Sequence, residues 1–248
     1  MMSTGRIRAD VACHRCINIM ILKLVEVRMN YKEAEKRLSE MQEKDDLSDD
    51  DYEILNDITK SDDMCLKCDA ADILIDHTAK QAVEILKMLS SDNDATVRAS
   101  AYDNMWVFEQ QDFDEILRNA VAHEKDGIAR SYAIFSLYDL YSENICDTAE
   151  LIAFMHKLYR TEKDRKCKLQ YLRNSYLSGE TDKLSEIIAY LEDEDYTMRI
   201  TAVNTFSEIR NNENKEVLLS AVKNRLKAEN SEAVKASIEE FVNKVEEI

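Results

Sequence analysis

The sequence predicts an all-α protein, an α-solenoid of about six helical-hairpin repeats with an N-terminal capping helix. Three observations lead to this prediction. One helical pattern recurs in six copies, proline is absent from the 248 residues while glycine occurs only three times, and no long stretch alternates apolar and polar residues as a strand does.

The recurring pattern is clearest at residues 93–105, NDATVRASAYDNM. Each copy has a basic residue, with a helix-capping residue four positions before it and a small or apolar residue three positions after it. The basic residues are spaced 31 to 38 residues apart, at Lys67, Arg98, Arg130, Lys168, Arg199 and Lys235. The capping residues, whose side-chain oxygens can accept the first free backbone amides, are Asp63, Asp94, Asp126, Asp164, Asp195 and Ser231.

A second amphipathic segment lies between successive copies. These segments span residues 79–89, 113–122, 149–159, 182–191 and 215–226. Each has apolar residues at helical spacing, so every unit is expected to contribute two helices. Two-helix units of this length stack into a solenoid, because each unit buries its apolar face only against its neighbours.

The copies resemble the short bacterial HEAT repeat, also called the phycobilisome-lyase-like repeat. The resemblance covers about residues 49–248 and rests on the pattern Asp-x-x-Val-Arg-x-x-Ala, best seen in TVRASAYDNM, TMRITAVNTF and AVKASIEEFV. It implies that the capped helices line a concave face. It also implies a structural ladder of Asp94, Asp126, Asp195, Arg98, Arg130 and Arg199 along that face. The copy at 163–175 departs most, because Tyr171 replaces the small residue and Ser175 a large apolar one.

Residues 1–48 are predicted to be an N-terminal helical cap or extension, and residues 49–248 the repeat region. The first 30 residues carry a net charge of +3, against −20 for the rest. Their apolar stretch INIMILKLVEV is too short to span a membrane, and no secretory cleavage site follows it. Two interpretations remain, a helix that covers the first repeat or an upstream extension with Met29 as the true start. The acidic run EKDDLSDDD at 43–51 is expected to be a turn that caps the next helix.

The net charge of −17, from 33 basic and 50 acidic residues, limits the possible partners. Such a chain repels phosphate backbones, so nucleic acid is not an expected partner. The charge indicates either a solvated acidic surface or a surface that attracts a basic protein or peptide. Because the sequence shows neither a membrane span nor a secretory signal, we expect a cytoplasmic protein.

The six cysteines include two C-x-x-C pairs, Cys13 with Cys16 and Cys65 with Cys68. In a cytoplasmic protein they are expected to be reduced thiols. The second pair falls inside a repeat helix, where two cysteines three positions apart are more often small buried side chains than metal ligands. We therefore predict no metal and no cofactor, with zinc binding by the two pairs as the alternative.

No catalytic motif is found in the sequence. The four histidines form no His-Glu-x-x-His pair and stand in no nucleophile motif, and the isolated glycines form no phosphate-binding loop. Carboxylates are so abundant in this chain that paired ones do not indicate acid–base chemistry. We predict that the protein is not an enzyme and assign no catalytic residue.

Aromatic residues gather on the middle three capped helices and define the candidate binding site. Most of them stand four, five or eight positions after the basic residue of their repeat. The predicted partner-binding residues are Tyr102, Trp106, Phe135, Tyr138, Tyr141, Arg173 and Tyr176. Tryptophan, tyrosine and arginine are the usual anchors of protein interfaces. The alternative interpretation is that these rings pack between neighbouring helices.

The HEAT-repeat resemblance most often implies a non-catalytic scaffold that binds a protein or peptide in its concave groove. A narrower version is an immunity protein that neutralises a basic toxin. Some HEAT-like solenoids are instead DNA glycosylases, with groove aromatics and a catalytic aspartate; Trp106 and Asp103 are the residues that resemble this arrangement. Without a basic groove to hold phosphates, the glycosylase is the less favoured alternative. A bilin-lyase-type subunit, with a tetrapyrrole stacked on the tyrosines, is a further possibility that the resemblance implies.

Overall fold

The computed structural model describes residues 31–246, and all the regular structure in this range is helical. The α-helices are α2 Tyr31–Gln42, α3 Asp49–Ile58, α4 Met64–Ile73, α5 Lys80–Leu89, α6 Ala95–Asp103, α7 Gln110–His123, α8 Gly127–Glu143, α9 Ala149–Tyr159, α10 Arg165–Leu177, α11 Leu184–Ala189, α12 Tyr196–Ile209, α13 Lys215–Ala228 and α14 Glu232–Glu246. Three short 3-10 helices are η1 Leu74–Asp76, η2 Thr181–Lys183 and η3 Tyr190–Glu192. The predicted all-α class is confirmed.

The helices begin where the sequence predicts, because their capping residues hold the first free amides. Asp94 accepts a hydrogen bond from the Thr96 amide at 2.7 Å, and Asp126 accepts from the amides of Ile128 and Ala129 in the first turn of its helix. Asp63, Asp164 and Asp195 cap α4, α10 and α12 in the same way. The acidic run before α3 forms a capping box, in which Ser48 and Asp51 exchange hydrogen bonds, so this turn is also confirmed.

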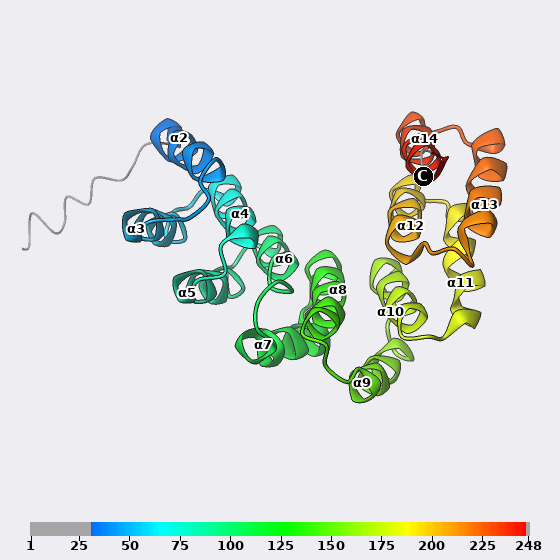
Figure 1. The fold of residues 1–248 in the computed structure, drawn as a ribbon, viewed down its shortest axis with the longest axis horizontal. Helices are drawn as coiled ribbons and strands as arrows, with labels where there is room; N and C mark the ends of the chain where they lie inside the picture. The colour runs from blue at the N-terminus through cyan, green and yellow to red at the C-terminus, as the bar shows by residue number, and fades with distance from the viewer. Residues whose placement is uncertain (1–30, 247–248) are drawn as a thin grey trace, which may run out of the picture.

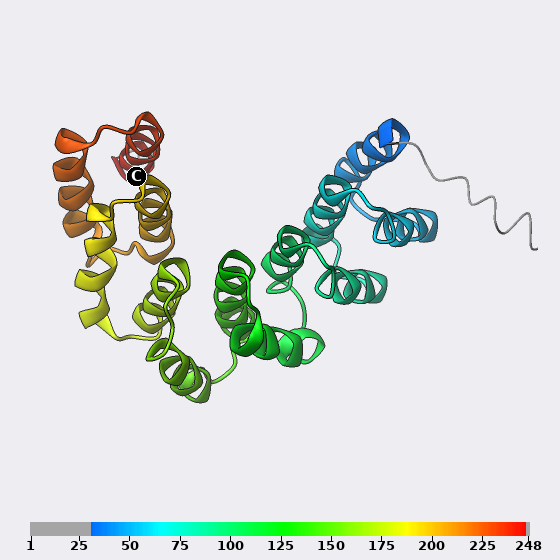
Figure 2. The ribbon, with the colours of Figure 1, turned by 180° about the vertical axis from the view of Figure 1, so that it is seen from behind.

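Successive helices alternate between two rows that bend into an open arc (Figures 1 and 2). The even-numbered helices form the row on the inside of the arc, which we call the inner row, and the odd-numbered helices form the outer row. Along the inner row α4 packs on α6, α6 on α8, α8 on α10, α10 on α12 and α12 on α14. Helix α2 packs on α4 and begins this row. The predicted N-terminal segment 1–30, with Cys13, Cys16 and Met29, lies outside the described residues.

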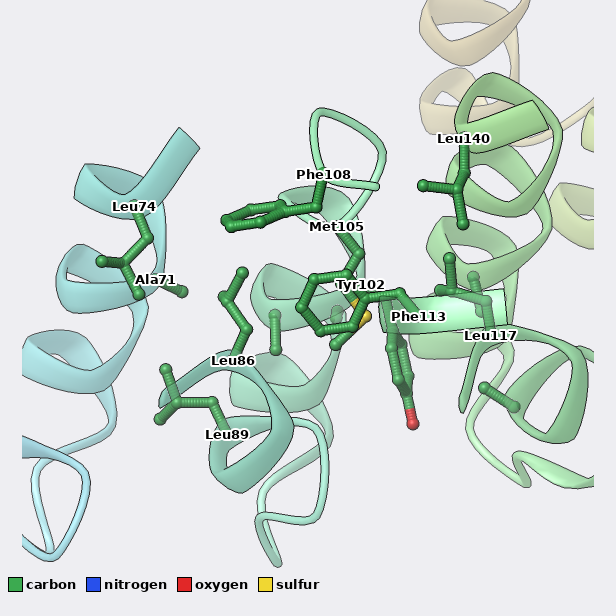
Figure 3. Packing of buried hydrophobic residues seen from close by; sticks show 14 of the residues in the cluster. Ala71, Leu74, Leu86, Leu89, Tyr102, Met105, Phe108, Phe113, Leu117 and Leu140 are labelled. Atoms are coloured by element: carbon green, nitrogen blue, oxygen red, sulfur yellow. The ribbon is translucent and has the colours of Figure 1, made fainter. Parts of the chain in front are cut away.

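The apolar core lies between the two rows and consists of two clusters of buried side chains that meet at α10. Figure 3 shows part of the first cluster, in which Leu86, Met105 and Phe113 gather among side chains from both rows. Tyr171 of the atypical copy is also buried and packs edge-on against Tyr159, with ring centroids 6.2 Å apart. The unusual residue at this position is therefore accommodated inside the core.

The basic residues of the repeats form a ladder, but their acidic partners differ from those expected. Arg98 forms an ion pair with Glu124 at 2.7 Å, and Arg130 forms the equivalent pair with Glu162 at 3.0 Å. Two more of these basic residues pair in the same way, Lys67 with Asp92 and Arg199 with Glu229. In the 163–175 copy Arg165 makes the ladder pair, with Asp193, in place of Lys168, and Lys235 pairs with Glu232 of its own helix. The capping aspartates instead bond the amides of their own helices, so the expected pairing of Asp94, Asp126 and Asp195 with the arginines is corrected.

Each ladder carboxylate stands two residues before the cap of the next inner helix and also holds the backbone there. Glu124 accepts the amide of Asp126 at 2.9 Å, and Glu229 accepts the amide of Ser231 at 2.8 Å. The arginine of the preceding repeat thus fixes the loop that begins the next repeat.

None of the helices in residues 31–246 has the length and apolar character needed to cross a bilayer.

Candidate functional site

The inside of the arc carries a cavity of about 290 Å³ between α6, α8, α10 and α12, which we call the inner pocket. Most of its lining residues stand two, five or nine positions after the basic residue of their repeat, and these positions share one side of a helix. Helix α8 thus contributes Tyr132 and Phe135, α6 contributes Asp103, α10 contributes Gln170 and α12 contributes Glu208. These residues form the inner face at the centre of the arc.

Four of the seven predicted binding residues lie in the core. Tyr102, Tyr138, Tyr141 and Tyr176 are only 5 to 8% exposed. Positions four and eight lie about 100° around a helix from positions five and nine, which turns these side chains toward the outer row. Trp106 follows α6 in a turn and is partly buried against the same core cluster. The aromatic groove expected at these positions is therefore corrected, and the rings pack between helices as the alternative interpretation held.

Hydrogen bonds from the buried tyrosines join the two rows. The Tyr141 hydroxyl donates to Asp114 of α7 at 2.8 Å and accepts from Arg118 of the same helix. The Tyr176 hydroxyl accepts from Asn214, the residue before α13, at 2.8 Å. Because buried hydroxyls are costly without such partners, these bonds give the tyrosines a structural role.

Arg173 and Phe135, the other two predicted residues, do meet on the inner face. The Arg173 guanidinium carbon lies 4.3 Å from the centre of the Phe135 ring. Its two terminal nitrogens donate to the two carboxylate oxygens of Asp139 at 3.0 Å each, and its Nε donates to Glu208. The side chain is only 5% exposed, and with a further bond to Asn174 this planar fork joins α8, α10 and α12 and uses four of its five N–H donors.

Carboxylates dominate the rest of the inner face. Asp72 of α4 accepts hydrogen bonds from Ser100 and Asn104 of α6, whereas Asp103 makes no hydrogen bond or ion pair with the described residues. Desolvation, followed by repulsion from Asp72 and Glu208, raises the pKa of Asp103 to about 6. Desolvation also raises the pKa of Glu208, although Arg173 opposes the shift. The inner face is therefore acidic and keeps one carboxylate free.

The acidic character of this face was not predicted from the sequence. The signal was present, because the position five after the basic residue holds Asp72, Asp103 and Glu240, and the position nine after it holds Asp139 and Glu208. In a chain with 50 acidic residues this recurrence becomes informative only when the inward-facing register is known.

Asp103→Asn is expected to stabilise the protein at neutral pH by about 1–3 kcal/mol. The folded-state pKa of about 6 exceeds the ordinary aspartate pKa of 3.8. The folded state therefore binds this proton more tightly, and stability falls as pH rises from about 4 to about 6. Urea unfolding at several pH values should show a gain at pH 7.5 that disappears near pH 4. Glu115→Gln, on the exposed side of α7, is the control, and an equal gain from it would contradict the assignment.

The structure brings one histidine against a serine, which the sequence motifs did not reveal. His156 Nε2 lies 3.0 Å from the hydroxyl of Ser175 and 3.0 Å from a carboxylate oxygen of Glu180. In a serine hydrolase the acid and the serine contact opposite ring nitrogens, so that the imidazole can relay a proton. Here both contact the same nitrogen, and Ser175 is buried. The geometry is that of a structural hydrogen-bond cluster.

Within the described residues, no three His, Cys, Asp or Glu side chains are placed to hold a metal ion together. Cys65 and Cys68 lie on α4 as expected, but Cys65 is exposed and Cys68 is half-buried, so the expectation that both are buried is wrong. Desolvation raises the pKa of the Cys68 thiol to about 11, so at neutral pH it is protonated and a poor ligand or nucleophile. The partner cysteines of the zinc alternative, Cys13 and Cys16, lie outside the described residues.

Comparisons of the chain with protein-family models, with curated proteins and with solved structures found no significant match.

Proposed function

We propose that the chain is a HEAT-like α-solenoid that acts as a non-catalytic scaffold and holds a basic peptide segment of a partner protein against its inner face. The observation that carries the proposal is the free carboxylate of Asp103 in a pocket on an acidic face. A cationic side chain would relieve the repulsion among Asp72, Asp103 and Glu208. Burial of the ligand against the face would strengthen that attraction, because screening by water and salt is reduced there.

Charge also bears on the alternative functions. An acidic face attracts a basic protein and accelerates its encounter, which fits both a general scaffold and a toxin-binding immunity protein. A DNA glycosylase must first hold phosphates, for which carboxylates around Asp103 are unfavourable. The tyrosines on which the sequence placed a stacked tetrapyrrole, Tyr138 and Tyr176 among them, are buried and offer it little ring surface. The basic peptide is therefore the ligand that the inner face favours.

A double variant on the inner face should weaken binding of a basic peptide. The probe is a fluorescein-labelled peptide of alternating glycine and lysine with one central arginine, followed by fluorescence anisotropy. Asp69 is exposed on α4 two positions after Lys67, on the same side as Asp72, whose charge helps to raise its pKa after desolvation. Asp69→Asn combined with Asp103→Asn is expected to raise the Kd of the probe roughly tenfold, because two attractive charges are lost. The matched control removes two charges from exposed residues of the outer row, Glu115→Gln with Glu150→Gln. Equal weakening by both pairs, or no binding to the wild type, would contradict the proposal.

A further inference from the structure

The inner pocket has two acceptor side chains without a donor, on the helices that pack on either side of α8. The half-buried Asp103 of α6 has no partner among the described residues, and the side-chain oxygen of Gln170 on α10 is buried without a donor. A buried acceptor such as the Gln170 oxygen is costly when it loses water without gaining a donor, and most such atoms in proteins are hydrogen-bonded. A ligand that carries several donors and a positive charge would therefore satisfy both residues together.

The pocket also offers an aromatic surface beside these acceptors. Tyr132 on α8 is 40% exposed, and it is close enough to Asp103 that the carboxylate raises the pKa of its phenol, after the larger contribution of desolvation. The neighbouring ring, Phe135, already carries the guanidinium of Arg173. An aromatic face beside a carboxylate attracts a flat cation, because the ring quadrupole and the anion act on the same charge.

Arg173 shows how this face holds a guanidinium. It combines a two-pronged bond to Asp139 with stacking over Phe135. Asp103 of α6 and Tyr132 of α8 again place a carboxylate and a ring in one pocket, but no cation among residues 31–246 pairs with Asp103. Lys166 lines the pocket as well and makes no ion pair with the described residues, and its charge opposes a cationic ligand.

We propose that the inner pocket binds a single arginine side chain of the partner, with Asp103 as the anionic acceptor, Gln170 as a second acceptor and Tyr132 as the stacking surface. Arginine fits better than lysine because its planar group presents five donors in a fixed fork and stacks on rings, whereas lysine presents a compact point charge. This inference rests on the proposed function and narrows it from a basic segment to an arginine-containing one.

The experiment compares three peptides that differ only at the central residue of the glycine–lysine probe. That residue is arginine, lysine of the same charge, or citrulline, which is nearly isosteric with arginine but neutral. Wild-type protein should bind the arginine peptide roughly tenfold more tightly than either of the others. Asp103→Asn and Gln170→Met should each reduce this preference, and Lys166→Gln should tighten binding of the arginine peptide.

The possible outcomes separate this inference from the proposed function. If the arginine and lysine peptides bind equally well and Asp103→Asn weakens both to the same extent, the basic-peptide scaffold stands and the arginine pocket is wrong. If none of the peptides binds the wild type, both fail. Far-UV circular dichroism of each variant establishes that it is folded, and Glu115→Gln on α7 should leave the preference for arginine unchanged.

Discussion

Glu229→Ala is expected to lower the free energy of unfolding by about 3–5 kcal/mol. The Glu229 side chain is 0% exposed and that of Arg199 is 9% exposed. Glu229 accepts two bonds from Arg199 at 2.8 Å and one from Arg225 at 2.9 Å, and it also holds the Ser231 amide at 2.8 Å. Its removal leaves Arg199 without its carboxylate, takes one of two carboxylates from Arg225, and frees the backbone amides of Asn230 and Ser231. Urea unfolding followed by circular dichroism measures the loss.

The position of Glu229 also predicts where the loss is felt. Helix α14 packs on α12 and α13 at the end of the row, so its amides should exchange with solvent faster in the variant than those of α6 or α8.

Hydrogen bonds from Arg199 lower the pKa of Glu229 to about 2. The ion pair therefore stabilises the fold fully at pH values above 4.5, the ordinary pKa of glutamate. The difference in unfolding free energy between the variant and wild type should shrink as pH falls toward about 2. Glu246→Ala, which breaks the half-exposed pair with Lys223, should cost no more than about 0.5 kcal/mol; a comparable cost there would contradict the assignment.

The helices could be predicted from the sequence because their signals are local. A capping aspartate and apolar residues at helical spacing lie within one segment of chain, and Asp94 and Asp126 cap the helices as expected. The acidic partners of the ladder arginines were not predicted, because these contacts join residues that are far apart in the sequence. Glu124 and Glu162 stand two residues before a cap, but they bind arginines 26 and 32 residues away, and only the packing of successive inner helices brings these together.

The inner face was predicted only in part, because most of the predicted aromatic residues stand one helix position away from it. Phe135 stands five positions after the basic residue and lines the inner pocket, and Arg173 at the same position contacts its ring but is itself buried. Tyr138 and Tyr176 stand eight positions after it, one residue short of the inner face, and so they point into the core. Helical periodicity identifies the apolar side of a helix. It does not by itself show which residues at the edge of that side pack against the outer row and which lie on the inner face.

Arg173→Met is expected to destabilise the fold by about 3–5 kcal/mol at neutral pH, because it leaves two carboxylates of a crowded acidic face without a counter-charge. Arg173 is 5% exposed and bonds Asp139 through both terminal nitrogens. Methionine fills much of the volume, so the loss reflects charge and hydrogen bonding more than a cavity. Arg173→Lys keeps the charge but not the fork or the stacking on Phe135, and an intermediate cost is expected.

The same variant separates stability from binding, because the two should change in opposite directions. Without Arg173 the inner face carries one more negative charge, so the folded variant should bind the glycine–lysine probe at least as tightly as wild type does, while its unfolding midpoint in urea falls. The deficit in stability should shrink between pH 7.5 and pH 4, since desolvation raises the pKa of Glu208 and Arg173 no longer opposes that shift in the variant, so that its carboxyl can take up a proton. Parallel losses of stability and binding would instead show that Arg173 contacts the peptide or shapes the pocket. In that case the free carboxylate of Asp103 would not be sufficient to attract a basic ligand.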